Sequence, residues 1–200
     1  MLILCDTNPD LCEEWHKVFD GNGDFKIICG SAFAVPDRVD AIVSPANSFG
    51  FMDGSFDYFL TQRFGLCVQE YFQDAITRSP YTGELLVGQV LPIPTHDRTI
   101  PYVLAAPTMR VPMILGANTI NPFLAFKAIV QYWIHGEVSL ENIVVPGLGT
   151  GVGKVPYKLC AEQMLRAYKD IVYRYRPRTW HEAVKWQLEL TNQEFRDLQK

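Results

Sequence analysis

The sequence feature that most constrains the fold is an alternation of short apolar runs with longer stretches of helical periodicity. The runs are rich in β-branched residues, are bounded by Gly, Pro, Asp or Asn, and cover residues 2–5, 25–29, 41–44, 86–93, 102–106 and 143–145. Apolar residues at helical spacing occupy residues 9–19, 56–77, 122–135 and 156–175. Short buried strands that alternate with helices predict a layered α/β fold.

The C-terminal tail, residues 177–200, has the pattern of one further helix. Thr179 and Glu182 stand at capping-box spacing. Apolar residues then recur along one predicted helix face, at Trp180, Ala183, Val184 and Leu188. We expect a helix that packs on the same domain, and a separate docking element is the alternative.

Composition restricts the class of protein. With 200 residues, 48% of them hydrophobic, the chain is long enough for one sizeable core. A formal charge of −4 argues against broad capture of nucleic acid, which relies on clustered Lys and Arg. Five cysteines without a C-x-x-C pair are typical of reduced thiols in the cytoplasm. No apolar run reaches the roughly 18 residues of a membrane span, so we expect no membrane association.

The first informative loop follows the apolar run at 41–44. Pro45, Ala46, Asn47 and Ser48 form a polar turn that leads to Gly50, Gly54 and a predicted helix. Glycine lets backbone N–H groups approach phosphate oxygens, and a helix start near Ser55 adds its positive dipole end. The alternative is that these glycines serve only the turn.

The second informative loop, residues 146–156, repeats this design after the run at 143–145. Gly147, Gly149, Gly151 and Gly153 are four glycines in seven residues, and Pro156 opens the next helix. Such a loop can cradle a diphosphate, with Thr150 adding a hydroxyl. It matches neither the dinucleotide fingerprint nor the P-loop, because Lys154 is followed by Val155.

Together the two loops resemble those of the macro domain family, which binds ADP-ribose and includes Appr-1″-p processing enzymes. Residues 39–57 resemble the family's strand, its Asn-Ala-Ala-Asn loop, its glycine-rich turn and its Asp, and residues 144–156 resemble its phosphate loop. The resemblance covers residues 25–175, within a macro-like domain at 1–176. It implies a three-layer α/β/α sandwich around a mixed, mostly parallel sheet.

The resemblance assigns roles residue by residue. Asn47 matches the family's second Asn, which lies against the distal ribose, and Asp57 matches the Asp that positions or activates water in members that release ADP-ribose. We therefore take Asn47 and Asp57 as the candidate catalytic residues. The alternatives are a turn role for Asn47 and a favourable helix-dipole position for Asp57. The ligand-binding residues implied are Ser31, Ala46, Asn47, Gly54, Ser55, Gly147, Gly149, Thr150, Gly151, Val152 and Gly153.

The chain also departs from the family pattern. Ser44 replaces the usual first Asn, and Met52-Asp53-Gly54-Ser55 replaces a run of glycines. Ser31 stands where an Asp commonly recognises the adenine amino group, and Gly153 stands where catalytic relatives often carry an aromatic residue. Asp6 and Asp37 are both candidates for the adenine contact.

Other polar residues have ordinary explanations. His96 and Asp97 lack a nucleophile in any recognisable elbow, so a polar hairpin turn is expected there. Arg110 is near the predicted cleft, but a surface salt bridge is its more common use. The histidines lack metal-ligand spacing, so neither a metal nor a cofactor is expected.

Two main functions stay open at this point. The first is a hydrolase that removes ADP-ribose from modified protein or from a small derivative of ADP-ribose. The second is a non-catalytic module that binds ADP-ribose or a related nucleotide. A protein whose cleft is vestigial and whose C-terminal helix docks a partner is a further alternative.

Overall fold

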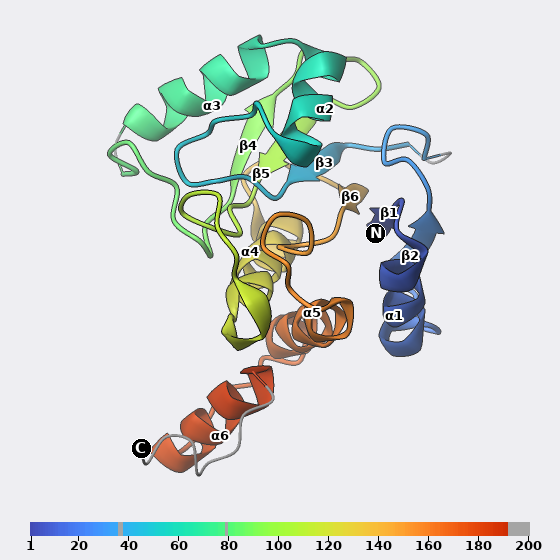
Figure 1. Cartoon of the computed structure of the whole chain (residues 1–200), viewed down its shortest axis with the longest axis vertical. Coiled ribbons are helices and arrows are strands. Elements are labelled where there is room, and N and C mark those ends of the chain that lie inside the picture. Colours follow the sequence, from blue (N-terminus) through green and yellow to red (C-terminus); the bar gives the residue numbers. More distant parts are fainter. Residues whose placement is uncertain (36–37, 79, 192–200) are drawn as a thin grey trace.

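The computed structural model describes residues 1–35, 38–78 and 80–191, and a six-stranded sheet runs through its centre (Figure 1). Its strands are β1 (Leu2–Asp6), β2 (Phe25–Cys29), β3 (Ala41–Ser44), β4 (Leu91–Pro94), β5 (Tyr102–Ala105) and β6 (Ile143–Val145). The order across the sheet is β2-β1-β6-β3-β5-β4. All neighbours are parallel except β4 and β5, which are antiparallel, so the expected mixed, mostly parallel sheet is confirmed.

Helices cover both faces of this sheet. On one face lie α1 (Pro9–Phe19), α4 (Asn121–His135) and α5 (Tyr157–Val172), and on the other lie α2 (Ser55–Phe64) and α3 (Cys67–Thr77) (Figure 1). Successive residues of a strand point to opposite faces: Leu2 and Leu4 join the first core, whereas Ile3 and Cys5 join the second. Burial on both faces explains why the central strands β3, β5 and β6 are almost entirely apolar, and the three-layer expectation is confirmed.

Two predicted elements have different limits in the structure. The helix expected over residues 56–77 is two helices, because Gly65 takes a φ of 91° and ends α2 there. The strand expected over residues 86–93 begins only at Leu91. Before it, the Gln89 N–H bonds the Leu86 carbonyl in a turn that contains Gly88 at a φ of 94°. Local glycine conformations override the apolar pattern in both places.

The last described helix, α6 (Trp180–Thr191), contacts α5. The hydroxyl of Thr179 accepts from the Glu182 N–H at 3.2 Å, as the capping pattern predicts. Leu188 is buried as the apolar face predicts, but Trp180 is 83% exposed, and Leu190 is a further buried residue of the helix. Residues 192–200 of the expected tail lie outside the described residues.

A buried amide joins α6 to the domain. The Gln163 side chain on α5 donates to the carbonyls of Thr119 and Leu190, each at 2.7 Å, and accepts from the Phe123 N–H at 3.2 Å. Every polar atom of this buried amide therefore has a partner. None of the described helices combines the length and the apolarity needed to cross a bilayer.

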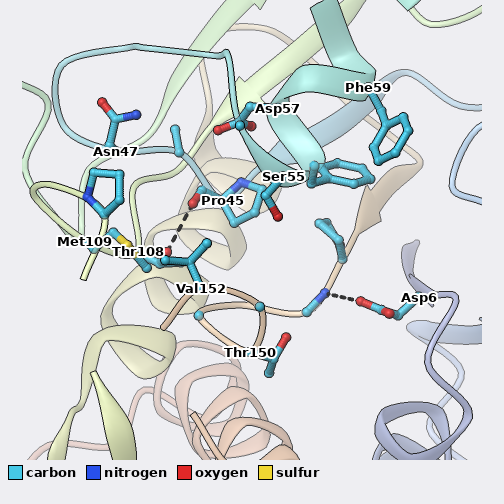
Figure 2. Close-up of a pocket in the computed structure, with 18 of the residues that line it drawn as sticks. Asp6, Pro45, Asn47, Ser55, Asp57, Phe59, Thr108, Met109, Thr150 and Val152 are labelled. Atoms are coloured by element: carbon cyan, nitrogen blue, oxygen red, sulfur yellow. Dashed lines mark hydrogen bonds between the residues drawn. The ribbon is translucent and has the colours of Figure 1, made fainter. Parts of the chain in front are cut away.

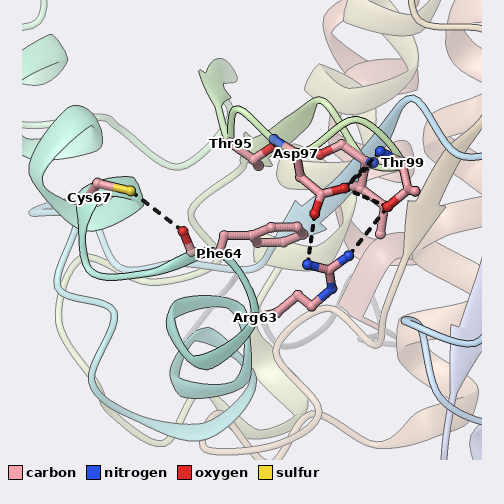
Figure 3. A network of polar contacts seen from close by, with 7 residues as sticks. Arg63, Phe64, Cys67, Thr95, Asp97 and Thr99 are labelled. Atoms are coloured by element: carbon pink, nitrogen blue, oxygen red, sulfur yellow. Dashed lines mark hydrogen bonds and ion pairs between the residues drawn. The ribbon is translucent and has the colours of Figure 1, made fainter.

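The segment with His96 and Asp97 is a polar turn of the β4–β5 hairpin, as expected. The Asp97 carboxylate accepts from the Thr99 hydroxyl, from the N–H groups of Thr99 and Ile100 at 2.7 and 3.0 Å, and pairs with Arg63 at 2.7 Å (Figure 3). These contacts, led by the Thr99 hydroxyl, lower the pKa of Asp97 from 3.8 to about 2. The turn is thus held by an ionised carboxylate.

Replacing Asp97 with Asn should lower the free energy of unfolding at neutral pH by about 1 kcal/mol. Because the folded pKa lies below the unfolded value, this stabilisation is present above about pH 4 and is lost as pH falls towards 2. Urea unfolding at neutral pH and near pH 2 measures the change in the free energy of unfolding. Asp74→Asn, which removes an exposed carboxylate paired with Arg78, is the control and should change little. An equal loss for Asp97→Asn at both pH values would contradict the prediction.

Candidate functional site

The candidate site lies where four parallel strands end. Because β1, β3, β5 and β6 run in the same direction, their carboxyl ends meet at one edge of the sheet, the usual location of a binding crevice. A cleft of about 530 Å³ opens at this edge (Figure 2). Its walls are formed by residues from four segments, 6–11, 45–59, 108–112 and 146–157.

The loop after β3 is attached to the segment after β5. Thr108 donates through its N–H to the Ala46 carbonyl at 3.1 Å and through its hydroxyl to the Pro45 carbonyl at 3.0 Å (Figure 2). A single parallel bridge joins Asn47 to Met109 beyond these bonds. The two segments therefore form one continuous wall of the cleft.

Asn47 lines the cleft, but its side chain mainly holds the loop together. The amide NH₂ donates to the Phe51 carbonyl at 2.7 Å, and the amide oxygen accepts from the N–H groups of Phe49 and Phe51 at 3.1 and 3.3 Å. The local turn role left open by the sequence is therefore present. One N–H of the amide has no hydrogen-bond partner in the described part of the chain.

The loop after β6 provides backbone donors. Asp6, at the end of β1, accepts from the Gly147 N–H at 3.1 Å and so fixes the start of this loop. Further on, the Val155 N–H bonds the Gly149 carbonyl at 3.1 Å, and Gly149 takes a φ of 72°. The N–H groups of residues 149–152 have no acceptor among the described residues. Unpaired backbone donors that line a cleft need water or a ligand.

The starts of two helices add to this donor set. Neither α2, which begins at Ser55, nor α5, which begins at Tyr157, has a side-chain hydrogen bond at its N-cap. Uncapped N–H groups and the helix dipole make such ends attractive to anions. The two loops also approach each other closely, since a Cβ added at Gly151 would lie 3.7 Å from the Ser55 hydroxyl oxygen. An anion between them would meet donors from both sides.

Asp57 lies in the first turn of α2, on the wall of the cleft (Figure 2). The hydroxyl of Ser44, at the end of β3, donates to its carboxylate at 2.6 Å. Desolvation is the main influence on this group. It raises the pKa of Asp57 from 3.8 to about 6, against the lowering effect of the Ser44 hydrogen bond, and the charge of Asp53 raises it further. A carboxyl group with this pKa can exchange a proton near neutral pH.

Most residues predicted for the site come together in the cleft. They are Ala46, Asn47, Gly54, Ser55, Asp57, Gly147, Gly149, Thr150, Gly151 and Val152. Ser31 and Gly153 do not line it. The Ser31 hydroxyl accepts from the Phe33 N–H in an exposed turn. A Cβ at Gly153 would collide with the Gly149 carbonyl oxygen, so this glycine is needed for the close folding of the loop.

The two alternatives for the adenine contact have different outcomes. Asp6 lines the cleft, and its carboxylate accepts from the N–H groups of Asn8 and Gly147 (Figure 2). Asp37 lies outside the described residues. Arg110 makes the expected surface pair, with Glu84 at 2.7 Å, and does not line the cleft.

Sequence reasoning missed several residues of the wall. Asn8 caps α1 and donates to the Tyr157 hydroxyl at 2.8 Å, which links the segment after β1 to α5. Phe51 and Phe59 add exposed rings, 56% and 57% exposed. The position of Asn8 directly after a parallel strand was the available signal, whereas nothing in the sequence separated these rings from core residues. Among the described residues, no cluster of three or more His, Cys, Asp or Glu side chains is placed to hold a metal ion.

Asp57→Asn should stabilise the protein above pH 6. The folded pKa of Asp57 is higher than the unfolded value, so its ionisation costs stability as pH rises from about 4 through 6. We expect a gain on the order of 2 kcal/mol near pH 8 and little gain near pH 4. Urea unfolding near pH 4 and near pH 8 tests this, with Asp74→Asn, an exposed carboxylate away from the cleft, as the control. Destabilisation of Asp57→Asn at both pH values would contradict it.

Comparison with known proteins agrees with this architecture. The model of the macro domain family matches residues 43–164. An uncharacterized protein of Aquifex aeolicus is 28% identical over 142 residues, which are 71% of this chain and 79% of that protein. The macrodomain of Mycobacterium tuberculosis DarG has a similar fold, with a TM-score of 0.55, 19% identity, and coverage of 72% of this chain and 89% of that one.

A macrodomain of Trypanosoma brucei, solved in complex with ADP-ribose, gives a TM-score of 0.52 at 18% identity. That match covers 69% of this chain and 53% of the other, so this chain corresponds to about half of that protein. At these identities the structures establish the fold. The family model covers more than half of the sequence and includes both loops of the cleft. The chain belongs to the macro domain family.

Proposed function

We propose that the cleft binds ADP-ribose or a derivative of it. The observation that carries the proposal is the set of unpaired backbone N–H groups at residues 149–152, which lies across the cleft from the uncapped start of α2. A diphosphate offers several anionic oxygens and is suited to such a donor set. The cleft volume of about 530 Å³ is in the range of small-molecule sites, roughly 300–1,000 Å³.

Family membership supports the identity of the nucleotide. The Trypanosoma brucei macrodomain of similar fold was solved with ADP-ribose bound. With the diphosphate against residues 149–152, the distal ribose would lie towards Asn47 and Asp57 on the opposite wall. The free amide N–H of Asn47 and the Asp57 carboxylate are then within the part of the cleft that meets ribose hydroxyls.

Hydrolysis is the second candidate function, and the environment of Asp57 favours it. A general base works best with a pKa near the working pH, and the pKa of Asp57 is raised to about 6. In the reaction we propose, water attacks the anomeric carbon of the distal ribose and its proton passes to the Asp57 carboxylate. The bond from that carbon to the ester oxygen breaks, and the modified group leaves as a carboxylate that keeps the bonding electron pair. The substrate would be an ADP-ribosylated protein or a small ADP-ribose ester.

Binding is tested by calorimetric titration with ADP-ribose. Wild-type protein should bind with a dissociation constant in the micromolar range. Gly151→Glu should abolish binding, because Gly151 has room for a side chain and the new carboxylate would repel the diphosphate. Gly23→Glu, at an open glycine away from the cleft, adds the same charge and should bind normally. Absence of heat with the folded wild-type protein, or equal binding by Gly151→Glu, would overturn the proposal.

Turnover is tested separately with mono-ADP-ribosylated protein as substrate and release of ADP-ribose as the measured product. Asp57→Asn should keep ADP-ribose binding and lose about 10²- to 10⁴-fold in rate, the usual contribution of a general base. The wild-type rate should rise with pH through about 6 and then level off, since the base must be ionised. Binding without release by the wild-type protein would identify a non-catalytic binding module instead.

A further inference from the structure

The connection between α5 and α6 is an exposed basic and aromatic segment. Residues 171–181 contain three arginines, Arg174, Arg176 and Arg178, and no Asp or Glu. Aromatic residues stand between and beside them: Tyr173 and Tyr175 are each 55% exposed, and the 83% exposure of Trp180 leaves its ring free of packing. This segment differs sharply from the rest of an acidic chain, whose formal charge is −4.

The three arginines have no acidic partner in the part of the chain that the structure describes. Elsewhere arginine side chains commonly pair with carboxylates, as in Arg63 with Asp97, Arg78 with Asp74, Arg110 with Glu84 and Arg166 with Asp170. Guanidinium groups that are not neutralised internally remain available to an external anion. Their planar donor fork is suited to phosphate.

A groove beside this segment adds further aromatic and cationic groups. It measures about 370 Å³, lies between α5 and α6, and is lined by Glu162, Leu165, Arg166, Lys169, Tyr175 and Trp186. The Arg166 guanidinium lies 4.3 Å from the centre of the Trp186 ring, and Lys169 has no ion pair among the described residues. A flat ring could enter between the aromatic walls while an anion meets Lys169.

Several backbone features restrict the conformation of this segment. Arg174 takes a φ of 52°, the Tyr175 N–H bonds the Asp170 carbonyl at 3.0 Å, and Pro177 restricts the chain before α6 begins. The segment follows the C-terminal end of α5, whereas the glycine loop precedes the start of α5, so a helix of 16 residues, about 24 Å long, lies between them. Binding here would be independent of the nucleotide cleft.

We propose that this basic–aromatic surface, residues 171–181 with the groove at Trp186, binds single-stranded nucleic acid. Arginines contact the phosphates, while Tyr173, Tyr175 and Trp180 stack with unpaired bases, the combination by which single strands are held without sequence preference. An acidic peptide would use the arginines but would leave the rings without a function. The negative net charge of the chain does not oppose this binding. Salt screens charges that lie farther than about 10 Å away, so a bound phosphate responds mainly to the arginines beside it.

Fluorescence anisotropy of the full chain with a fluorescein-labelled oligothymidylate of about 16 nucleotides tests the proposal. Wild-type protein should bind at low salt, with affinity that falls as salt rises. A plot of log affinity against log salt concentration has a negative slope. The triple variant Arg174→Ala, Arg176→Ala, Arg178→Ala should reduce the magnitude of this slope by about 2. Tyr175→Ala with Trp180→Ala should weaken binding about tenfold or more. All of these variants should bind ADP-ribose as the wild-type protein does.

The control is a triple variant of exposed cations elsewhere, Lys17→Ala, Arg78→Ala and Arg98→Ala, which removes the same charge and should bind the oligonucleotide nearly normally. No binding by wild-type protein at low salt would overturn the proposal, as would an equal loss in the control. Equal affinity for a duplex, together with no effect of the aromatic variant, would also overturn it, because the protein would then bind nucleic acid by charge attraction alone. Competition by a polyglutamate peptide or by phosphatidylserine vesicles, with no loss in the aromatic variant, would assign the surface to those partners instead.

Discussion

The pairing of β3 with β6 is the constraint on which the site depends. These strands come from distant parts of the chain, yet Ala41 pairs with Ile143 and Ile42 with Val144 in parallel register. Both strands therefore end at the same edge, and their loops lie next to each other. The loop after β3 contributes Asn47 and leads to Asp57, and the loop after β6 contributes the unpaired N–H groups. A change of strand order would separate these parts, although each loop sequence would be unchanged.

Close packing of the second loop and burial of Asp57 then determine the chemical properties of the cleft. Gly153 allows the second loop to fold against the Gly149 carbonyl, so that loop stays compact while its outer N–H groups remain unpaired. Burial of Asp57 in the first turn of α2 raises the pKa of its carboxyl group to about 6, so its ionisation at neutral pH costs stability. Stability given up at this position is consistent with a functional carboxylate.

The fold and most of the cleft were predictable from the sequence, since strands buried on both faces and two glycine-bearing loops leave clear patterns. The details that depend on tertiary contacts could not be predicted from the sequence. The pattern at Asn47 is compatible with both a ligand role and a turn role, and only the structure shows the bonds from its amide to the loop backbone. Ser31 aligned with a binding position, yet it lies in an exposed turn outside the cleft. Trp180 fits an apolar helix face but is exposed, whereas the far end of α6 is held by the bond from Gln163 to the Leu190 carbonyl.

The most direct test of the account follows the backbone amides themselves during titration with ADP-ribose, in ¹H–¹⁵N correlation spectra. If the unpaired donors of the second loop hold the diphosphate, the largest shifts will fall on Gly149, Thr150, Gly151 and Val152, with smaller shifts at the start of α2. Amides of the α5–α6 connection should not move. Shifts that leave residues 149–152 unchanged while the protein binds the nucleotide would contradict the account, because the cradle would then not be the site.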